Sequence, residues 1–186
     1  MLLLHICCAP CFTYVRKVLR EKNIEFTGYF YNPNINPLEE FLLRAETLKK
    51  FASQMGDKVI FNFSYPYRDY IARFLALENE GKIRCSACYE GRLRTVAKFA
   101  KKHDYRAFST TLLLSPYQKH ELLVETGKRI ADEEGLDFYY EDFRPGFKES
   151  IELAKNYNLY RQNYCGCIFS EYERHEKKLK RLENAP

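Results

Sequence analysis

Seven cysteines fall into three short groups, and no cysteine lies outside them. The groups are Cys7-Cys8-Ala9-Pro10-Cys11, Cys85-Ser86-Ala87-Cys88 and Cys165-Gly166-Cys167. Buried structural cysteines would be scattered through core segments, so clustering in three loop-like places indicates a chemical task. Thiolates that are close in sequence can converge on one metal centre, and a C-x-x-C pair does so for zinc and for iron–sulfur clusters alike.

Spacing alone leaves zinc and iron–sulfur ligation both open. A structural zinc site is the commoner use of paired C-x-x-C motifs, but four thiolates would saturate the ion and leave three cysteines without a task. The adjacent pair Cys7 and Cys8, with Cys11 three residues on, is also unusual for a zinc knuckle. Neither metal is excluded by these patterns.

The third group, Cys165-Gly166-Cys167, differs from a metal-binding loop in its spacing. A disulfide across one intervening residue closes a small, strained ring, which makes the bond more easily reduced than a structural one. Gly166 supplies the backbone freedom that such a ring needs. The pair therefore suits a redox switch or an electron relay, and the alternative is that it supplies two further metal ligands.

Apolar patterns predict strands that alternate with helices, which is typical of an α/β domain with a mostly parallel sheet. Strands are expected at 2–6, 25–31, 59–63, 106–111 and 137–141. Helices are expected at 12–22, 38–54, 67–79, 89–103, 117–134, 147–156 and 169–183, with Asn36 capping the second and Gly135 ending the fifth. Ligands of such sheets bind outside the carboxyl ends of the strands. The first cysteine group comes just after the strand expected at 2–6, and it therefore falls at this edge of the sheet.

Length and composition limit the class of protein. A chain of 186 residues fits one domain, covering 1–186. The net charge of +5 permits a polyanionic partner without demanding one. No apolar run is long enough for a membrane span or a signal peptide, so we expect a cytoplasmic protein. Disulfides are uncommon there, and the odd cysteine count argues against a disulfide-stabilised secreted domain.

Four motifs, in order across nearly the whole chain, resemble those of one known family. They are residues 4–11 (LHICCAPC), 29–35 (YFYNPNI), 84–89 (RCSACY) and 164–167 (YCGC). In these the chain resembles the QueH type of epoxyqueuosine reductase. One C-x-x-C alone would be a weak signal, but the four motifs together are highly specific.

The resemblance implies a Rossmann-like fold related to PP-loop (HUP-like) nucleotide hydrolases, with a cysteine-lined metal site at the carboxyl ends of the strands. It implies a [4Fe-4S] cluster as cofactor, held by Cys7, Cys8, Cys85 and Cys88. Cys11 is then left over and could bind a second iron ion beside the cluster. Cys165 and Cys167 resemble a redox-active pair.

The implied activity is the last step of queuosine synthesis, in which the epoxide oxygen of epoxyqueuosine in tRNA is removed. Reducing an epoxide to an alkene takes two electrons and two protons and releases water, so an external electron donor is also implied. The partner would be a tRNA anticodon loop, whose bases can be splayed out and stacked on aromatic side chains. Candidate proton donors, by type or by closeness to a motif, are His5, Tyr164 and Asp142.

Two basic stretches could contact tRNA phosphates, although each alone is typical of a solvated helix face. The first comprises Arg92, Arg94, Lys98, Lys101 and Lys102, and the second comprises Lys177, Lys178, Lys180 and Arg181.

Two rival functions belong to other classes. An ATP-dependent PP-loop tRNA-modifying enzyme needs a Gly/Ser-rich phosphate loop after the first strand, where this chain has Cys-Cys-Ala-Pro-Cys. A zinc-binding nucleic-acid module remains the other alternative, and metal analysis separates it from a reductase.

Overall fold

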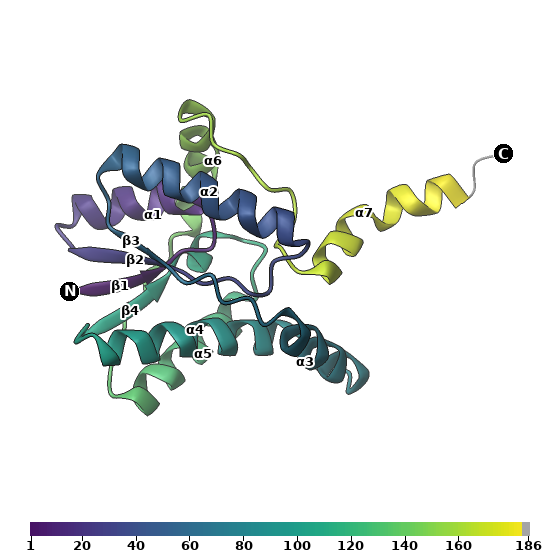
Figure 1. Ribbon diagram of the computed structural model, residues 1–186, viewed down its shortest axis with the longest axis horizontal. Helices are drawn as coiled ribbons and strands as arrows, with labels where there is room; N and C mark the ends of the chain where they lie inside the picture. The colour runs from purple at the N-terminus through teal and green to yellow at the C-terminus, as the bar shows by residue number, and fades with distance from the viewer. Residues whose placement is uncertain (184–186) are drawn as a thin grey trace.

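The computed structural model describes residues 1–183, so the last three residues of the expected 1–186 domain lie outside the described range. Its centre is a five-stranded parallel sheet in the order β3-β2-β1-β4-β5 (Figure 1). The strands are β1 (Leu2–His5), β2 (Phe26–Phe30), β3 (Val59–Phe61), β4 (Ala107–Thr110) and β5 (Asp137–Phe138). This order confirms the predicted Rossmann-like α/β class.

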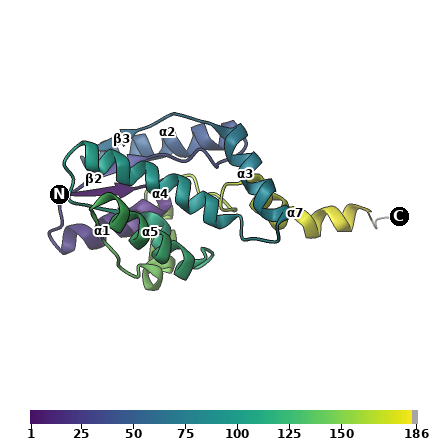
Figure 2. The same ribbon diagram turned by 90° about the horizontal axis from the view of Figure 1, so that it is seen from below.

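Helices cover both faces of the sheet. They are α1 (Ala9–Glu21), α2 (Leu38–Met55), α3 (Tyr67–Asn79), α4 (Cys85–Lys102), α5 (His120–Glu134), α6 (Phe147–Asn156) and α7 (Ile168–Glu183). Helices α1, α2 and α6 lie on one side, and α4 and α5 lie on the other (Figure 1). Helix α7 begins beside α3 and then extends away from the body (Figure 2).

The core explains why the short N-terminal run becomes the central strand. Every residue of β1 and β2 is buried, as expected for parallel strands covered by helices on both faces. Phe12 of α1 meets Phe26 and Phe51 edge-to-face at ring-centroid distances of 5.8 and 6.0 Å, which joins α1, β2 and α2. The start of α1 is thereby fixed against the sheet.

Three predicted helix starts are wrong. The helix expected at 12–22 begins at Ala9, because Pro10 fits the first turn of a helix, where its missing N–H is not needed. The helix expected at 89–103 begins at Cys85, because the small residues after Ile83 continue the helical turn and the backbone N–H of Cys88 reaches the Arg84 carbonyl at 3.4 Å. Cys85 and Cys88 therefore lie on a helix rather than in a loop. The helix expected at 117–134 begins at His120, after a 3₁₀ turn over Thr111–Leu114.

The predicted cap of the second helix is also wrong. Pro37 is the residue that precedes the first turn of α2, and the helix begins at Leu38. Asn36 anchors the loop instead of capping the helix: its side-chain amide donates to Asn34 O at 3.0 Å and its backbone N–H donates to Gly166 O at 2.7 Å. Gly135 does end α5 in a left-handed conformation, as predicted.

None of the helices in the described part of the chain combines the length and the apolar character needed to cross a membrane.

Candidate metal centre

The first cysteine group lies where the strand order changes direction. β1 and β4 are neighbours in the sheet, yet the helices that follow them, α1 and α5, lie on opposite faces (Figure 1). Cys7 follows β1 closely and Thr111 follows β4 directly. The Cys7 N–H donates to Thr111 Oγ1 at 3.1 Å, and this hydroxyl lies 3.3 Å from Cys7 Sγ. The site thus occupies the crevice where α/β sheets bind ligands.

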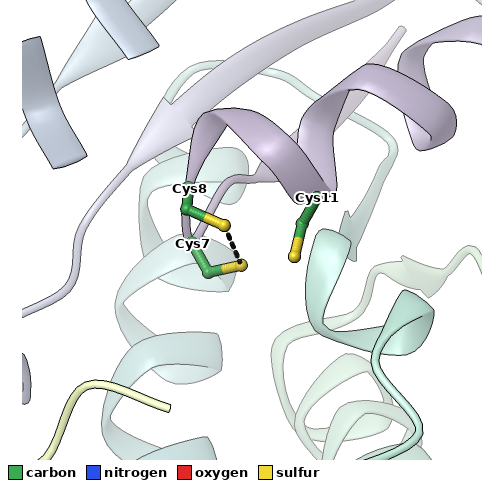
Figure 3. A group of neighbouring side chains, drawn as sticks. All are labelled: Cys7, Cys8 and Cys11. Atoms are coloured by element: carbon green, nitrogen blue, oxygen red, sulfur yellow. Dashed lines mark hydrogen bonds between the residues drawn. The ribbon is translucent and has the colours of Figure 1, made fainter. Parts of the chain in front are cut away.

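Three sulfur atoms converge here (Figure 3). The Sγ atoms of Cys7, Cys8 and Cys11 all lie within 4.8 Å of one another, and those of Cys7 and Cys8 are 3.7 Å apart. Cys8 precedes α1 and Cys11 lies one turn later, which puts both on the same helix face. Thiolates bound to one tetrahedral ion at about 2.3 Å would lie about 3.8 Å apart. The three residues could therefore bind a metal.

The chemistry of this donor set favours a soft metal. Thiolates select zinc, copper(I) and iron–sulfur clusters over hard cations. Hydrogen bonds from the Cys11 and Cys8 thiols hold the pKa of Cys7 well below its usual range, whereas the bond to Cys7 raises the pKa of Cys11. One thiolate therefore forms first, and a cation at the centre would favour ionisation of all three.

The second group lies on the first turn of α4 and outside this trio. Within residues 1–183, Cys7, Cys8 and Cys11 form the sole set of three or more such ligands that meets the 4.8 Å spacing. Cys88 is buried against Tyr70 and Phe74 of α3, in a small apolar cluster that Cys167 also contacts. Burial raises the pKa of Cys88 to about 12.

The third group, on the loop before α7, consists of free thiols; Cys165 is exposed and Cys167 is half-buried. Gly166 between them has a φ of 132°, a region that side chains rarely adopt. A Cβ there would lie 3.0 Å from Ile35 Cγ1 and 3.2 Å from Arg44 Nη1. Both the positive φ and these close contacts therefore favour glycine at this position.

Arg44 of α2 holds that loop in place. Its side chain is buried and forms an ion pair with Glu40 at 2.6 Å. Nη1 donates to Cys165 O at 3.0 Å and Nη2 donates to Tyr164 O at 3.3 Å. Sequence reasoning missed Arg44. The Glu40–Arg44 spacing indicates an ion pair on a helix, but nothing in it points to a loop 120 residues away.

Two glutamine amides link the groups. Gln162 Nε2 donates to Cys8 Sγ at 2.8 Å, and Gln118 Nε2 donates to Cys165 Sγ at 3.5 Å. The orientation of Gln118 is fixed by Tyr89, whose hydroxyl accepts from the Lys119 N–H at 3.0 Å and donates to Gln118 Oε1 at 2.9 Å. The amide nitrogen is consequently the end that faces the thiol.

A cavity of about 480 Å³ connects sulfur atoms of the first and third groups. Its lining includes Cys7, Cys11, Cys165, Tyr117, Phe147 and Tyr164. A volume of this size is sufficient for a small molecule or for one end of a larger one.

The proton-donor candidates differ in position. His5 is fully buried between Thr110 Oγ1 at 2.8 Å and Tyr31 O at 3.1 Å. Burial lowers its pKa to about 4, so it is a neutral structural residue near pH 7. Asp142 is exposed and paired with Arg144. Of the three candidates, Tyr164 alone lines the cavity, and its hydroxyl donates to Asn36 O.

The basic surface predicted on α4 is wrong in part. Arg92 is buried, with 2 % of its surface exposed. Arg94 is paired with Glu133 at 2.6 Å, and Lys101 lies 3.5 Å from Glu134. The pairing of Arg94 with Glu90, one turn earlier on α4, is readable from helical spacing, but Glu133 and Glu134 come from α5 and periodicity could not reveal them. The basic residues of α7, in contrast, are exposed: Lys177, Lys178, Lys180 and Arg181.

Known proteins match this chain over most of its length. The family model described as epoxyqueuosine reductase QueH matches residues 2–173. The epoxyqueuosine reductase QueH of Dehalococcoides mccartyi is 40 % identical over 95 % of this chain and 95 % of its own length. The proteins of the same name from Thermotoga maritima and Haemophilus influenzae are 36 % and 37 % identical, over 94 % and 91 % of this chain and 92 % and 71 % of theirs.

Proposed function

The chain belongs to the QueH family of epoxyqueuosine reductases, and we propose that it removes the epoxide oxygen of epoxyqueuosine in tRNA, the last step of queuosine synthesis. The observation that carries this proposal is the convergence of Cys7, Cys8 and Cys11 beside a cavity that Cys165 also lines. Clustered thiols and a space large enough for one end of a substrate therefore lie at the place where this fold binds its ligands.

For the cofactor we propose a [4Fe-4S] cluster on Cys7, Cys8, Cys85 and Cys88, with a second iron ion on Cys11. The support is the chemistry of the residues: three clustered cysteines with no carboxylate among them, largely buried, and a C-x-x-C pair on a helix turn. When bound, these metals supply electrons and a Lewis acid for an epoxide oxygen.

We propose that the cavity receives the modified base of the anticodon loop. Tyr117 is 82 % exposed, lines the cavity and lies edge-on to Phe147 at 5.8 Å. An exposed ring next to a cavity is suited to stacking on a splayed-out base. The amides of Gln118 and Gln162 line the same space and hold the sulfur atoms in position.

Cys165 and Cys167 are proposed as the redox pair. Oxidation of two thiols to a disulfide releases two electrons and two protons, which equals the demand of converting an epoxide to an alkene and water. An external donor would then reduce the disulfide. The support is the exposure of Cys165 at the cavity and the separation of the two cysteines by one glycine.

We further propose that residues 1–186 act as one unit in the cytoplasm, where a reducing environment keeps seven thiols available.

The activity is tested with protein reconstituted anaerobically with iron and sulfide. tRNA bearing epoxyqueuosine is incubated with it and dithionite, and the digested nucleosides are analysed by mass spectrometry. We expect loss of one oxygen atom from the modified nucleoside, abolished by Cys88→Ser and retained by Ser86→Ala on the same turn. An unchanged nucleoside with the cluster loaded, or turnover only with ATP, would contradict the assignment.

The redox pair is tested in the same assay with Cys165→Ser and Cys167→Ser. Each is expected to lose nearly all multiple turnover while keeping its iron content. Full activity in both would remove the pair from the mechanism.

A further inference from the structure

Arg92 of α4 lies at the thiol groups instead of on the surface. Nη2 donates to Cys88 Sγ at 3.0 Å, and Nε donates to Cys88 O at 3.3 Å. Nη1 lies 3.5 Å from Asn32 Oδ1. Asn32 is itself fixed, since its amide nitrogen donates to Ile6 O at 2.9 Å at the end of β1. Arg92 therefore connects the second cysteine group to the strand end that carries the first.

The charge of Arg92 has no carboxylate to balance it. Within residues 1–183, no Asp or Glu oxygen lies within 4.0 Å of its guanidinium. A buried cation without an anion is strongly unfavourable, so another negative group is required. The sulfur of Cys88, which accepts a hydrogen bond from Nη2 at 3.0 Å, is the group of the cysteine clusters in direct contact with the guanidinium.

Arg44 provides the contrast within the same molecule. It is equally buried, with 2 % of its surface exposed, but Glu40 lies 2.6 Å from its Nε. The charge of Arg44 is thus balanced by the protein itself. Arg92 has no such carboxylate within the described residues, and its Nη2 instead contacts the sulfur of Cys88.

We propose that Arg92 is a positioning residue that balances the negative charge of the thiolate centre, holds Cys88 for ligation and raises the reduction potential of the cluster. This inference rests on the proposed function. A one-electron reduction adds a negative charge, which a fixed neighbouring guanidinium stabilises. A hydrogen bond to a ligand sulfur acts in the same direction.

The test compares Arg92→Gln and Arg92→Lys with wild type, after anaerobic reconstitution and counting of iron and sulfide. Arg94→Gln is the matched control, because it removes one positive charge from the same helix at the surface. The readout is the midpoint potential from a redox titration followed by optical and paramagnetic spectra.

We expect Arg92→Gln to shift the reduction equilibrium at least tenfold toward the oxidised form, a midpoint more negative by about 59 mV for one electron. Arg92→Lys keeps the charge without the two-pronged contact, so its potential should fall between those of Arg92→Gln and wild type. Arg94→Gln should match wild type. Equal potentials in all four proteins would overturn the inference while leaving the proposed function intact.

Before the redox titration, circular dichroism and urea unfolding establish whether each metal-free protein folds. A variant that folds without metal but loses iron faster to a chelator than Arg94→Gln supports the role. If Arg92→Gln and Arg92→Lys both fail to fold without metal, Arg92 belongs to the stability of the fold and the inference is wrong. If wild type takes up no iron, the proposed function fails and this inference fails with it.

Discussion

Single side chains decide what the cavity can bind. Tyr117 is the most exposed large hydrophobic residue of the described chain, at 82 %. Its ring lies edge-on to Phe147, with an interplanar angle of 82°, and both rings line the cavity that contains the sulfur atoms. An aromatic ring exposed at a cavity is available for a ligand to stack on.

The chain contains no tryptophan, so Tyr117→Trp introduces a single indole reporter. We expect its fluorescence to be quenched when tRNA carrying epoxyqueuosine binds, because a base stacks on the ring. Tyr117→Ala should weaken binding roughly tenfold or more, given about 1–3 kcal/mol for a base–aromatic stack. Tyr157→Trp, which lies against Phe51 of α2 and does not line the cavity, is the control. Equal quenching at both positions would argue against stacking at the cavity.

The cysteines and two buried arginines show which residues of the site can be predicted from the sequence and which cannot. The cysteines are recognisable because their type and spacing are local features. Arg92 was interpreted as part of a surface patch and Arg44 was not singled out, although both are buried beside the cysteine groups. Whether an arginine is buried depends on packing against distant segments, which no local pattern encodes.

Helix α2 anchors the loop that carries the third cysteine group. Arg44 donates to the carbonyls of Tyr164 and Cys165, and Tyr160 donates to the other oxygen of Glu40 at 2.6 Å. The irregular segment between α6 and α7 is thereby tied to one face of α2. The positions of Cys165 and Cys167 depend on this attachment.

Arg44→Gln should loosen the loop and leave the Glu40 carboxylate buried without its partner. We expect a loss of roughly 3 kcal/mol in the free energy of unfolding. Hydrogen exchange at residues 160–167 and the rate of Cys165 alkylation should both rise. Lys49→Gln, at an exposed position of α2, is the control and should change neither. Unaltered exchange in Arg44→Gln would show that the loop is held by other contacts.

The alternation of apolar runs is sufficient to predict the succession of strands and helices along the chain and the parallel character of the sheet. Helix starts were less predictable. The start of α4 at Cys85 depends on the Cys88–Arg84 backbone bond and on packing of Cys88 against α3. The backbone bond is local to the first turn, but the packing of Cys88 forms only when α3 and α4 are folded together, and the sequence around Cys85 alone indicates a loop.

Helix α7 extends away from the body of the molecule, and none of its residues is buried (Figure 2). It begins at the third cysteine group, and it carries exposed lysines at 177 and 178. The basic residues of α7 are concentrated in the stretch from Lys177 to Arg181, and this exposed stretch is suited to contact tRNA phosphates. The basic residues of α4 are less suited, since Arg92 is buried and Arg94 is paired.

The double variant Lys177→Gln/Lys178→Gln should weaken tRNA binding and reduce its salt dependence. Each lost phosphate contact is expected to lower the slope of log affinity against log salt by about 0.7 to 0.9. Binding is measured over a series of salt concentrations by fluorescence anisotropy of labelled tRNA. Lys49→Gln/Lys50→Gln removes the same charge from α2 and should leave the slope unchanged. Equal losses in both variants would mean that net charge alone is responsible.

The most direct measurement on the central claim is the metal and sulfide content of anaerobically reconstituted protein, combined with its optical and paramagnetic spectra. If the cysteine groups hold an iron–sulfur centre, each chain should contain about four iron and four sulfide, and one more iron if Cys11 is occupied. The solution should be brown and should bleach on reduction. A colourless protein with stoichiometric zinc and no sulfide would contradict the account.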